Sequence, residues 1–170
     1  MKKLSLFLLI NFCSFSLSNA QDRVQKLIAE IKASNTIECI VLGYAGMPSA
    51  LFMKADTLNG LLSAKDKIQL FNDSSYVLKY YCFHYLLSDK DNDSVVFELL
   101  KKVINDTSEV AYYCSCLIDI YPFNGLLVEE YYHFIQSKYK DGNPTVLGNS
   151  NKVYMFSKPD KKSIKKNYIS

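Results

Sequence analysis

The chain contains one phrase twice, as FNDSSYVLKYYC at residues 71–82 and as INDTSEVAYYC at residues 104–114. In both copies an Asn-Asp pair ends one apolar run and small hydroxyl residues precede the next. Asp, Ser and Thr side chains accept hydrogen bonds from the free amides that begin a helix. Each copy therefore predicts a tight turn between two helices, and the two copies together predict a repeated helical hairpin.

The helices around these turns are predicted to differ in burial. Residues 94–104 carry a single apolar stripe backed by charged residues, which is typical of an outer helix covering one side of a protein. The stripe consists of Val96, Leu99, Leu100 and Val103. Residues 76–87 and 110–121 are apolar almost all round, which predicts inner helices sandwiched between neighbours.

Helical patterns also dominate the rest of residues 21–139. Apolar residues recur at helical spacing in a first amphipathic helix, at Val24, Leu27, Ile28 and Ile31. A second apolar stretch, residues 37–45, ends at Gly46, which suits a helix C-terminus. A third segment follows over residues 49–62. Ser63 with Asp66 resembles a capping box that opens a short helix to Phe71, and a last helix is predicted over residues 126–139.

An outer helix, a turn containing Asp, and an inner helix with Val a few residues later resemble the HEAT repeat. The resemblance covers about residues 63–139, and Leu78 and Ala111 replace the arginine often found after that Val. It implies an all-α fold of stacked antiparallel hairpins, a HEAT-like α-solenoid, over residues 21–142. Small exported bacterial proteins are similar in layout. The resemblance further implies a protein-binding or scaffold module that uses a helical-repeat surface and is not an enzyme.

The first twenty residues have the pattern of a cleaved signal peptide. Lys2 and Lys3 precede a short apolar run, and small residues Ser18 and Ala20 mark a cleavage site. Export to the periplasm or the medium is therefore predicted. Cys13 leaves a lipoprotein as an alternative, although the residues before it are not the small ones of a lipid-attachment box.

The C-terminal part, residues 143–170, is predicted to be an irregular segment with a lysine-rich tail. The alternative to a solvated tail is electrostatic attraction to an anionic surface. Residues 21–156 are mildly acidic and Arg23 is the only arginine in the chain. Nucleic-acid binding, which needs a clustered basic face, is not expected. No stretch after the leader is long and apolar enough to predict a membrane span.

Four cysteines remain after the leader: Cys39, Cys82, Cys114 and Cys116. They allow three complete pairings, which the sequence does not separate, and buried free thiols are the other interpretation. On the predicted helix, Cys114 and Cys116 point about 200° apart. That geometry excludes their holding one zinc ion together.

Three tyrosine pairs suggest a binding groove. Adjacent residues on a helix point about 100° apart, so one member of each pair can enter the core while the other reaches a groove rim. Tyrosine is enriched in binding hot spots. The predicted groove residues are Tyr80, His84, Tyr112, Tyr113 and Tyr131. The alternative is that these side chains are bulky core packers.

No catalytic residue, metal ligand or cofactor is predicted, and the protein is expected to act as a monomer with an unidentified protein partner. Two alternatives stay open. One is an enzyme with an unrecognised Cys/His site, built from Cys82 or Cys114 with His84 or His133. The other is a calcium-responsive structural protein that uses the Asp89–Asp93 loop, whose alternating carboxylates resemble the start of a calcium loop. Its other interpretation is a solvated loop that ends in Ser94 as a helix N-cap.

Overall fold

A computed structural model of the protein describes residues 20–88 and 92–139. The predicted signal peptide apart from Ala20, part of the Asp89–Asp93 loop and nearly all of the C-terminal segment lie outside the described residues. The described chain divides into two compact units. Unit 1 comprises residues 20–86 and 110–120, and unit 2 comprises residues 87–88, 92–109 and 121–139. Each unit is described by itself.

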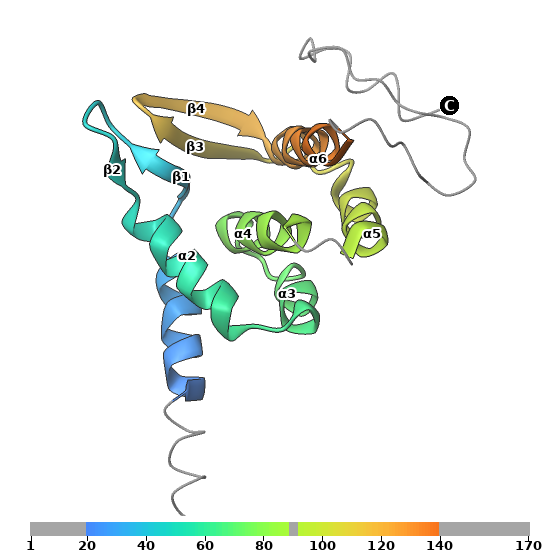
Figure 1. Ribbon diagram of the computed structural model, residues 1–170, viewed down its shortest axis with the longest axis horizontal. Helices are drawn as coiled ribbons and strands as arrows, with labels where there is room; N and C mark the ends of the chain where they lie inside the picture. The colour runs from blue at the N-terminus through green and yellow to red at the C-terminus, as the bar shows by residue number, and fades with distance from the viewer. Residues whose placement is uncertain (1–19, 89–91, 140–170) are drawn as a thin grey trace, which may run out of the picture. The chain divides into compact units, whose positions relative to one another are not determined.

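Unit 1 contains a β-sheet, so the prediction of an all-α, HEAT-like α-solenoid is wrong. The four strands are β1 (Thr36–Leu42), β2 (Met47–Pro48), β3 (Glu109–Ser115) and β4 (Leu117–Pro122), in the order β2-β1-β3-β4. β1 pairs antiparallel with β2 and parallel with β3. The sheet is therefore mixed, and β4 forms one of its edges. In Figure 1, β3 and β4 run side by side in opposite directions as a two-stranded ribbon.

The strands replace two of the predicted helices. Residues 37–45 lie largely in β1, and the predicted inner helix over residues 110–121 is the β3–β4 hairpin. The hairpin reverses at Ser115, whose φ of 54° lies in the left-handed region. Largely apolar runs of this length do not distinguish a buried helix from a strand by periodicity. The β-branched and aromatic content of both runs favours strands, and the pairing of β1 with β3 decides the outcome.

The helices of unit 1 largely confirm the predicted ones. A helix covers residues 20–32, and α2 (Ala50–Leu61), α3 (Ala64–Leu70) and α4 (Tyr76–Leu87) follow. Ser49 caps α2 by accepting a hydrogen bond from the amide of Phe52 at 2.8 Å. The capping box of α3 is present, with Ser63 and Asp66 bonded reciprocally. These start signals depend only on local sequence, which explains why they were readable.

The core of unit 1 is built around α4. Leu78 and Phe83 on this helix have no exposed surface, and neither have Ile31 of the first helix and Ile37 of β1. The prediction that α4 is a buried helix is confirmed. β1 contacts α2, so the sheet and the helices share one core.

Unit 2 contains α5 (Asp93–Val103) and α6 (Phe123–Tyr139), which contact each other. The predicted stripe of α5 is buried in full: Val96, Leu99, Leu100 and Val103. The helix begins one residue before the predicted start, with Asn92 rather than Ser94 at the N-cap position. The α6 helix begins at Phe123, three residues before its predicted start. Asn124 joins α6 to the end of α5, because its side-chain amide donates to the carbonyl of Ile104 at 2.6 Å.

The repeated phrase forms the same turn twice and different elements after it. Asp73 accepts a hydrogen bond from the amide of Ser75 at 2.8 Å, and Asp106 accepts one from the amide of Ser108 at 3.1 Å. Both are Asx turns. After the first, the chain enters α4. After the second, the carbonyl of Ser108 accepts from the amide of Phe123 at 2.8 Å and the chain enters β3.

Candidate functional site

The structure brings three of the five predicted groove residues together. Tyr80 and His84 stack, with ring centroids 6.0 Å apart and an interplanar angle of 19°, and Tyr112 meets Tyr80 edge-on at 6.0 Å. Phe52 of α2 adds an edge contact to His84 at 6.0 Å. Tyr80 is only 3% exposed, so this aromatic cluster packs unit 1 more than it lines a rim.

The other two predicted groove residues lie elsewhere. Tyr113 follows Tyr112 on β3, and its hydroxyl lies next to Gly43 in the β1–β2 turn, 4.0 Å from where a Cβ of that residue would stand. Tyr131 belongs to unit 2, where its ring packs against Phe97 with centroids 6.1 Å apart. The five residues therefore do not form one described surface.

A partly buried polar network connects β1 to α2 and α4, and sequence reasoning missed it. The hydroxyl of Tyr81 accepts a hydrogen bond from the amide of Glu38 at 3.1 Å and donates to the carbonyl of Glu38 at 2.8 Å. The hydroxyl of Ser49, which has no exposed surface, donates to the carboxylate of Glu38 at 2.5 Å. Burial raises the pKa of Tyr81 above its ordinary range. The hydroxyl therefore stays protonated, and its role is to hydrogen-bond the backbone of Glu38 rather than to act as a base.

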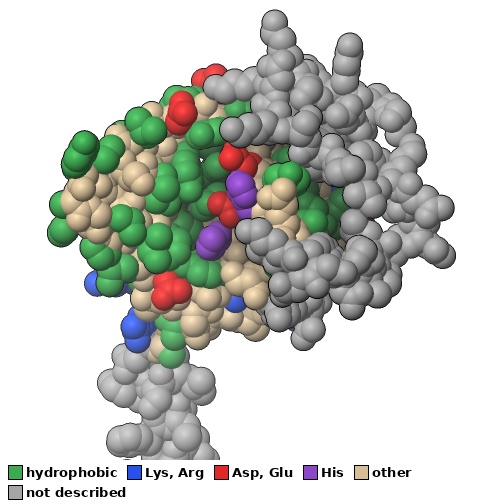
Figure 2. All heavy atoms as spheres, turned by 45° about the horizontal axis from the view of Figure 1, so that its top comes forward, with side chains coloured by type: hydrophobic (Ala, Val, Ile, Leu, Met, Phe, Trp, Pro, Cys, Tyr) green, Lys and Arg blue, Asp and Glu red, His purple; other side chains and the backbone are tan. Residues whose placement is uncertain are grey.

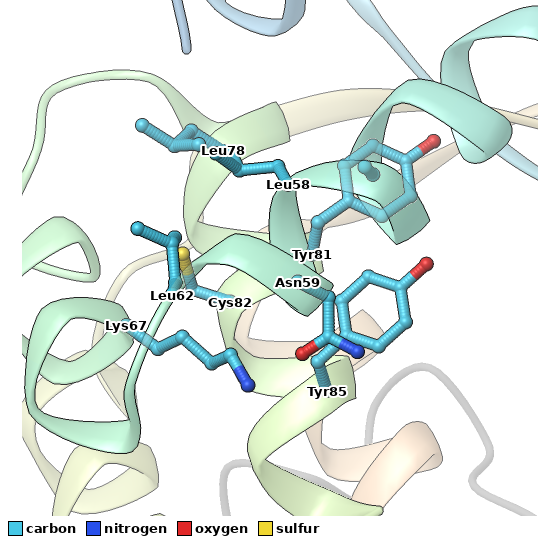
Figure 3. A pocket seen from close by; sticks show the side chains of 9 residues that line it. Leu58, Asn59, Leu62, Lys67, Leu78, Tyr81, Cys82 and Tyr85 are labelled. Carbon is cyan, nitrogen blue, oxygen red and sulfur yellow. The ribbon is translucent and has the colours of Figure 1, made fainter. Parts of the chain in front are cut away.

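A small pocket lies between α2, α3 and α4. Figure 3 shows the rings of Tyr81 and Tyr85 on one side of it and Leu62 and Lys67 on the other. Its volume of about 10 Å³ has room for roughly one water molecule. Burial, followed by the negative charge of Asp56, raises the pKa of Tyr85. The pocket is too small for an organic substrate.

Neither cysteine named for catalysis is available as a nucleophile in the structure, since Cys114 is bonded to Cys39. Cys82 is 4% exposed, and burial raises the pKa of its thiol to about 12, which leaves it protonated at neutral pH. His133 is exposed, and its Nε2 lies 3.8 Å from Oε1 of Glu129, one turn away on α6. Among residues 20–88 and 92–139, no cluster of three or more His, Cys, Asp or Glu side chains is arranged to hold a metal ion. Part of the Asp89–Asp93 loop lies outside this range.

The most distinctive surface of unit 1 is an exposed apolar area on its sheet. We call it the apolar sheet surface, and its members are Ile40, Val41, Tyr44, Met47, Leu117, Ile118 and Ile120. Tyr44 is fully exposed. Met47, Leu117 and Ile118 are 64%, 74% and 65% exposed. Figure 2 shows hydrophobic side chains gathered over the part of this face where the sheet lies. The members lie on both faces of the sheet, because sequence neighbours in a strand such as Leu117 and Ile118 point to opposite sides. Exposed apolar side chains commonly occur at interaction sites.

The two edges of the sheet differ in how well they are protected. β2 is two residues long and ends in Pro48, and both features discourage further pairing. β4 is six residues long, and its residues 117–120 are exposed on both faces, since successive side chains alternate. No other described strand pairs with its outer edge. A sequence signal for this strand was present, because LIDIY at residues 117–121 is rich in β-branched residues.

The sheet carries acidic side chains and no basic ones. Glu38, Glu109 and Asp119 are its charged residues, and residues 36–48 and 109–122 contain neither lysine nor arginine. A lysine on an edge strand is a common protection against pairing with another chain. The edge of β4 has an aspartate instead, which would attract a basic partner.

Within the described residues, none of the helices combines the length and the apolar character needed to cross a membrane. Comparison of the chain with protein-family models, with curated proteins and with solved structures gives no match.

Proposed function

We propose that the protein is an exported, monomeric, non-enzymatic binding module that takes an extended segment of a partner protein along the outer edge of β4. The observation that carries the proposal is the outer edge of β4, with which no strand of residues 20–88 and 92–139 pairs. β4 presents a row of backbone donors and acceptors beside exposed apolar side chains, and it ends the sheet. Addition of a partner strand to such an edge is a common mode of peptide recognition.

The chemistry of the partner segment follows from the composition of the sheet. Main-chain hydrogen bonds to β4 require an extended backbone, and Ile118 and Ile120 on one face favour apolar side chains at alternate positions. Asp119 is the only charge on β4, and Glu109 adds negative charge to the adjacent β3 and Glu38 to the next strand, β1. A segment that alternates apolar and basic residues therefore complements this edge.

The position of β3 supports binding by a prearranged edge. A disulfide joins Cys39 of β1 to Cys114 of β3, and β3 in turn pairs with β4. A strand that is held in place before binding loses less conformational entropy on association. A disulfide also fits an exported protein, because such bonds persist in oxidising compartments. The signal-peptide pattern of residues 1–20 supports the same location.

The direct test uses two synthetic peptides of equal length, one alternating valine and lysine and the other alternating valine and glutamate. Fluorescence anisotropy with the oxidised chain lacking its leader measures both affinities. We expect binding of the lysine peptide only, and a loss of at least tenfold in the double variant Ile118→Thr/Ile120→Thr. Threonine keeps the β-branched shape and removes apolar contact. Met53→Thr is the matched control, since Met53 is 59% exposed but lies on α2.

Charge reversal at Asp119 gives the second arm of the test. Asp119→Lys is expected to lower the affinity for the lysine peptide and to allow the glutamate peptide to bind. Equal affinity of both peptides for the unmodified chain would contradict the assigned partner chemistry. A concentration-dependent dimer in sedimentation analysis that is lost in Ile118→Thr/Ile120→Thr, with no peptide binding, would replace the proposal by pairing between two copies.

A further inference from the structure

A disulfide joins β1 to β3, and a further cysteine follows it in the β3–β4 turn. Cys39 and Cys114 belong to adjacent parallel strands, and their Cα atoms are 5.0 Å apart in the disulfide. The strand register explains the pairing, because Glu38 lies opposite Tyr113 and the next residue of each strand is a cysteine. Both cysteines are half-buried. The bond is therefore within reach of a thiol at the surface of the sheet.

Such a thiol lies two residues further along the chain. Cys116 occupies the turn between β3 and β4 and is exposed. Residues two apart have Cα atoms at most about 7 Å apart in an extended chain, and a turn brings them closer. This falls within the range that a disulfide spans. Ser115 between them has a φ of 54°, and its carbonyl accepts a hydrogen bond from the amide of Gly43, so the turn is held against β1.

The fourth cysteine provides an internal contrast. Cys82 is buried on α4, away from solvent, and is not bonded to another cysteine. Buried structural thiols are inert, whereas partly exposed ones exchange. Among the described cysteines, Cys116 is the free thiol that solvent reaches.

We propose that Cys39, Cys114 and Cys116 form a thiol–disulfide exchange site in which Cys114 is the shared sulfur. Cys116 loses its proton to water, and its thiolate attacks Sγ of Cys114. The Cys114–Cys116 bond forms as the Cys39–Cys114 bond breaks, and the Cys39 thiolate leaves and takes up a proton from water. The number of disulfides does not change, so the step needs no external oxidant or reductant.

The exchange has a definite structural result. In one form a covalent bond joins β1 to β3, and in the other the bond closes the β3–β4 turn and β1 is held by hydrogen bonds and packing alone. The site therefore makes the anchoring of β1 to β3 depend on which of the two disulfides is present. This inference does not depend on partner binding at β4.

Peptide mapping of the oxidised protein distinguishes the two forms. Trypsin cleavage at lysines places Cys39 in residues 33–54 and both Cys114 and Cys116 in residues 103–138. The two peptides are linked in the first form and separate in the second. After incubation at pH 7 to 8.5, acid quenching and alkylation, we expect separate peptides with Cys39 alkylated. Their rate of appearance should rise with pH, because the thiolate is the species that attacks the disulfide.

Two variants make the result decisive. Cys116→Ser should give only linked peptides, whereas Cys82→Ser should behave as the unmodified chain. In Cys39→Ser, treatment with oxidised glutathione should bridge Cys114 to Cys116 and make residues 103–138 two hydrogen atoms lighter. Failure of that bridge to form, or separation of the peptides at equal rate in Cys116→Ser, would overturn the proposal.

Discussion

The hydroxyl of Tyr81 takes the place of a neighbouring strand beside Glu38, accepting from its amide at 3.1 Å and donating to its carbonyl at 2.8 Å. β2 pairs only with Val41 and Leu42 of β1. Without Tyr81, the amide and carbonyl of Glu38 would therefore have no strand on that side to bond them. One side chain of α4 therefore completes the sheet.

Tyr81→Phe is expected to destabilise the protein by about 1–3 kcal/mol, because it removes the hydrogen bonds that the Tyr81 hydroxyl makes to the partly buried backbone of Glu38. Urea unfolding followed by circular dichroism measures the change. Tyr44→Phe is the matched control, since Tyr44 is fully exposed, and it should change stability by less than about 0.5 kcal/mol. Equal effects of the two variants would show that the Tyr81 hydroxyl contributes nothing specific.

Ser49→Ala is expected to cost about 1–2 kcal/mol. It removes the N-cap of α2 and the hydrogen bond to the Glu38 carboxylate together. Ser63→Ala, which removes the exposed cap of α3, should cost less, because water can replace the lost bonds there. The same unfolding experiment compares them. A larger loss in Ser63→Ala would mean that the polar network around Glu38 is dispensable.

The disulfide is expected to be the largest single contribution to stability. It connects residues separated by 75 positions, and closing a loop of that length in the unfolded chain corresponds to about 4 kcal/mol. The double variant Cys39→Ala/Cys114→Ala should lose this amount in urea unfolding, and the unmodified protein under reducing conditions should unfold at a similar midpoint. Cys116→Ser, which retains the Cys39–Cys114 bond, should stay within about 0.5 kcal/mol of the unmodified protein in that bonded form.

The Asp73–Lys32 ion pair should make stability depend on pH. Burial acts to raise the pKa of Asp73, but the hydrogen bonds from Lys32 and from the amide of Ser75 outweigh it and lower the pKa. A lowered folded pKa means that the contribution is complete above the unfolded value of roughly 3.9. It is lost as the pH falls through the folded pKa.

Asp73→Asn isolates the charge, because the amide oxygen can still accept from Ser75. At pH 7 it should cost about 0.5–1 kcal/mol, a size typical of exposed pairs, and the difference from the unmodified protein should shrink as the pH falls below 4. Urea midpoints at several pH values measure this. Lys32→Met should give a similar loss at pH 7. A difference that stays constant at all pH values would contradict the role of the Asp73 charge.

The sequence predicted the elements whose signals lie within a few residues of one another. Ser49 and Ser63 mark helix starts through bonds to amides three residues away, and the stripe on α5 requires only its own spacing to be recognised. The failure lies in β1, β3 and β4. β1 and β3 are short, largely apolar runs, and their strand conformation depends on pairing between residues more than seventy positions apart, such as Glu38 with Tyr113. β4 then pairs with β3. No local pattern contains that information.

The candidate site was missed for the same reason. A helix over residues 110–121 would have buried Ile118 and Ile120 among neighbours, whereas the hairpin leaves them exposed. Of the predicted groove, Tyr80, His84 and Tyr112 do meet, although α4 and β3 bring them together rather than two stacked helices. The hydrogen bonds of Tyr81 to Glu38 could not be predicted without knowing that residues 36–42 form a strand.

The paired Asx turns at Asp73 and Asp106 have a consequence for protein engineering. Residues 104–108 grafted into another protein would transfer a change of chain direction and no preference for what comes next. The long-range contacts of the host protein would decide whether a helix or a strand follows. A sequence motif that recurs is therefore weak evidence for a recurring structural unit.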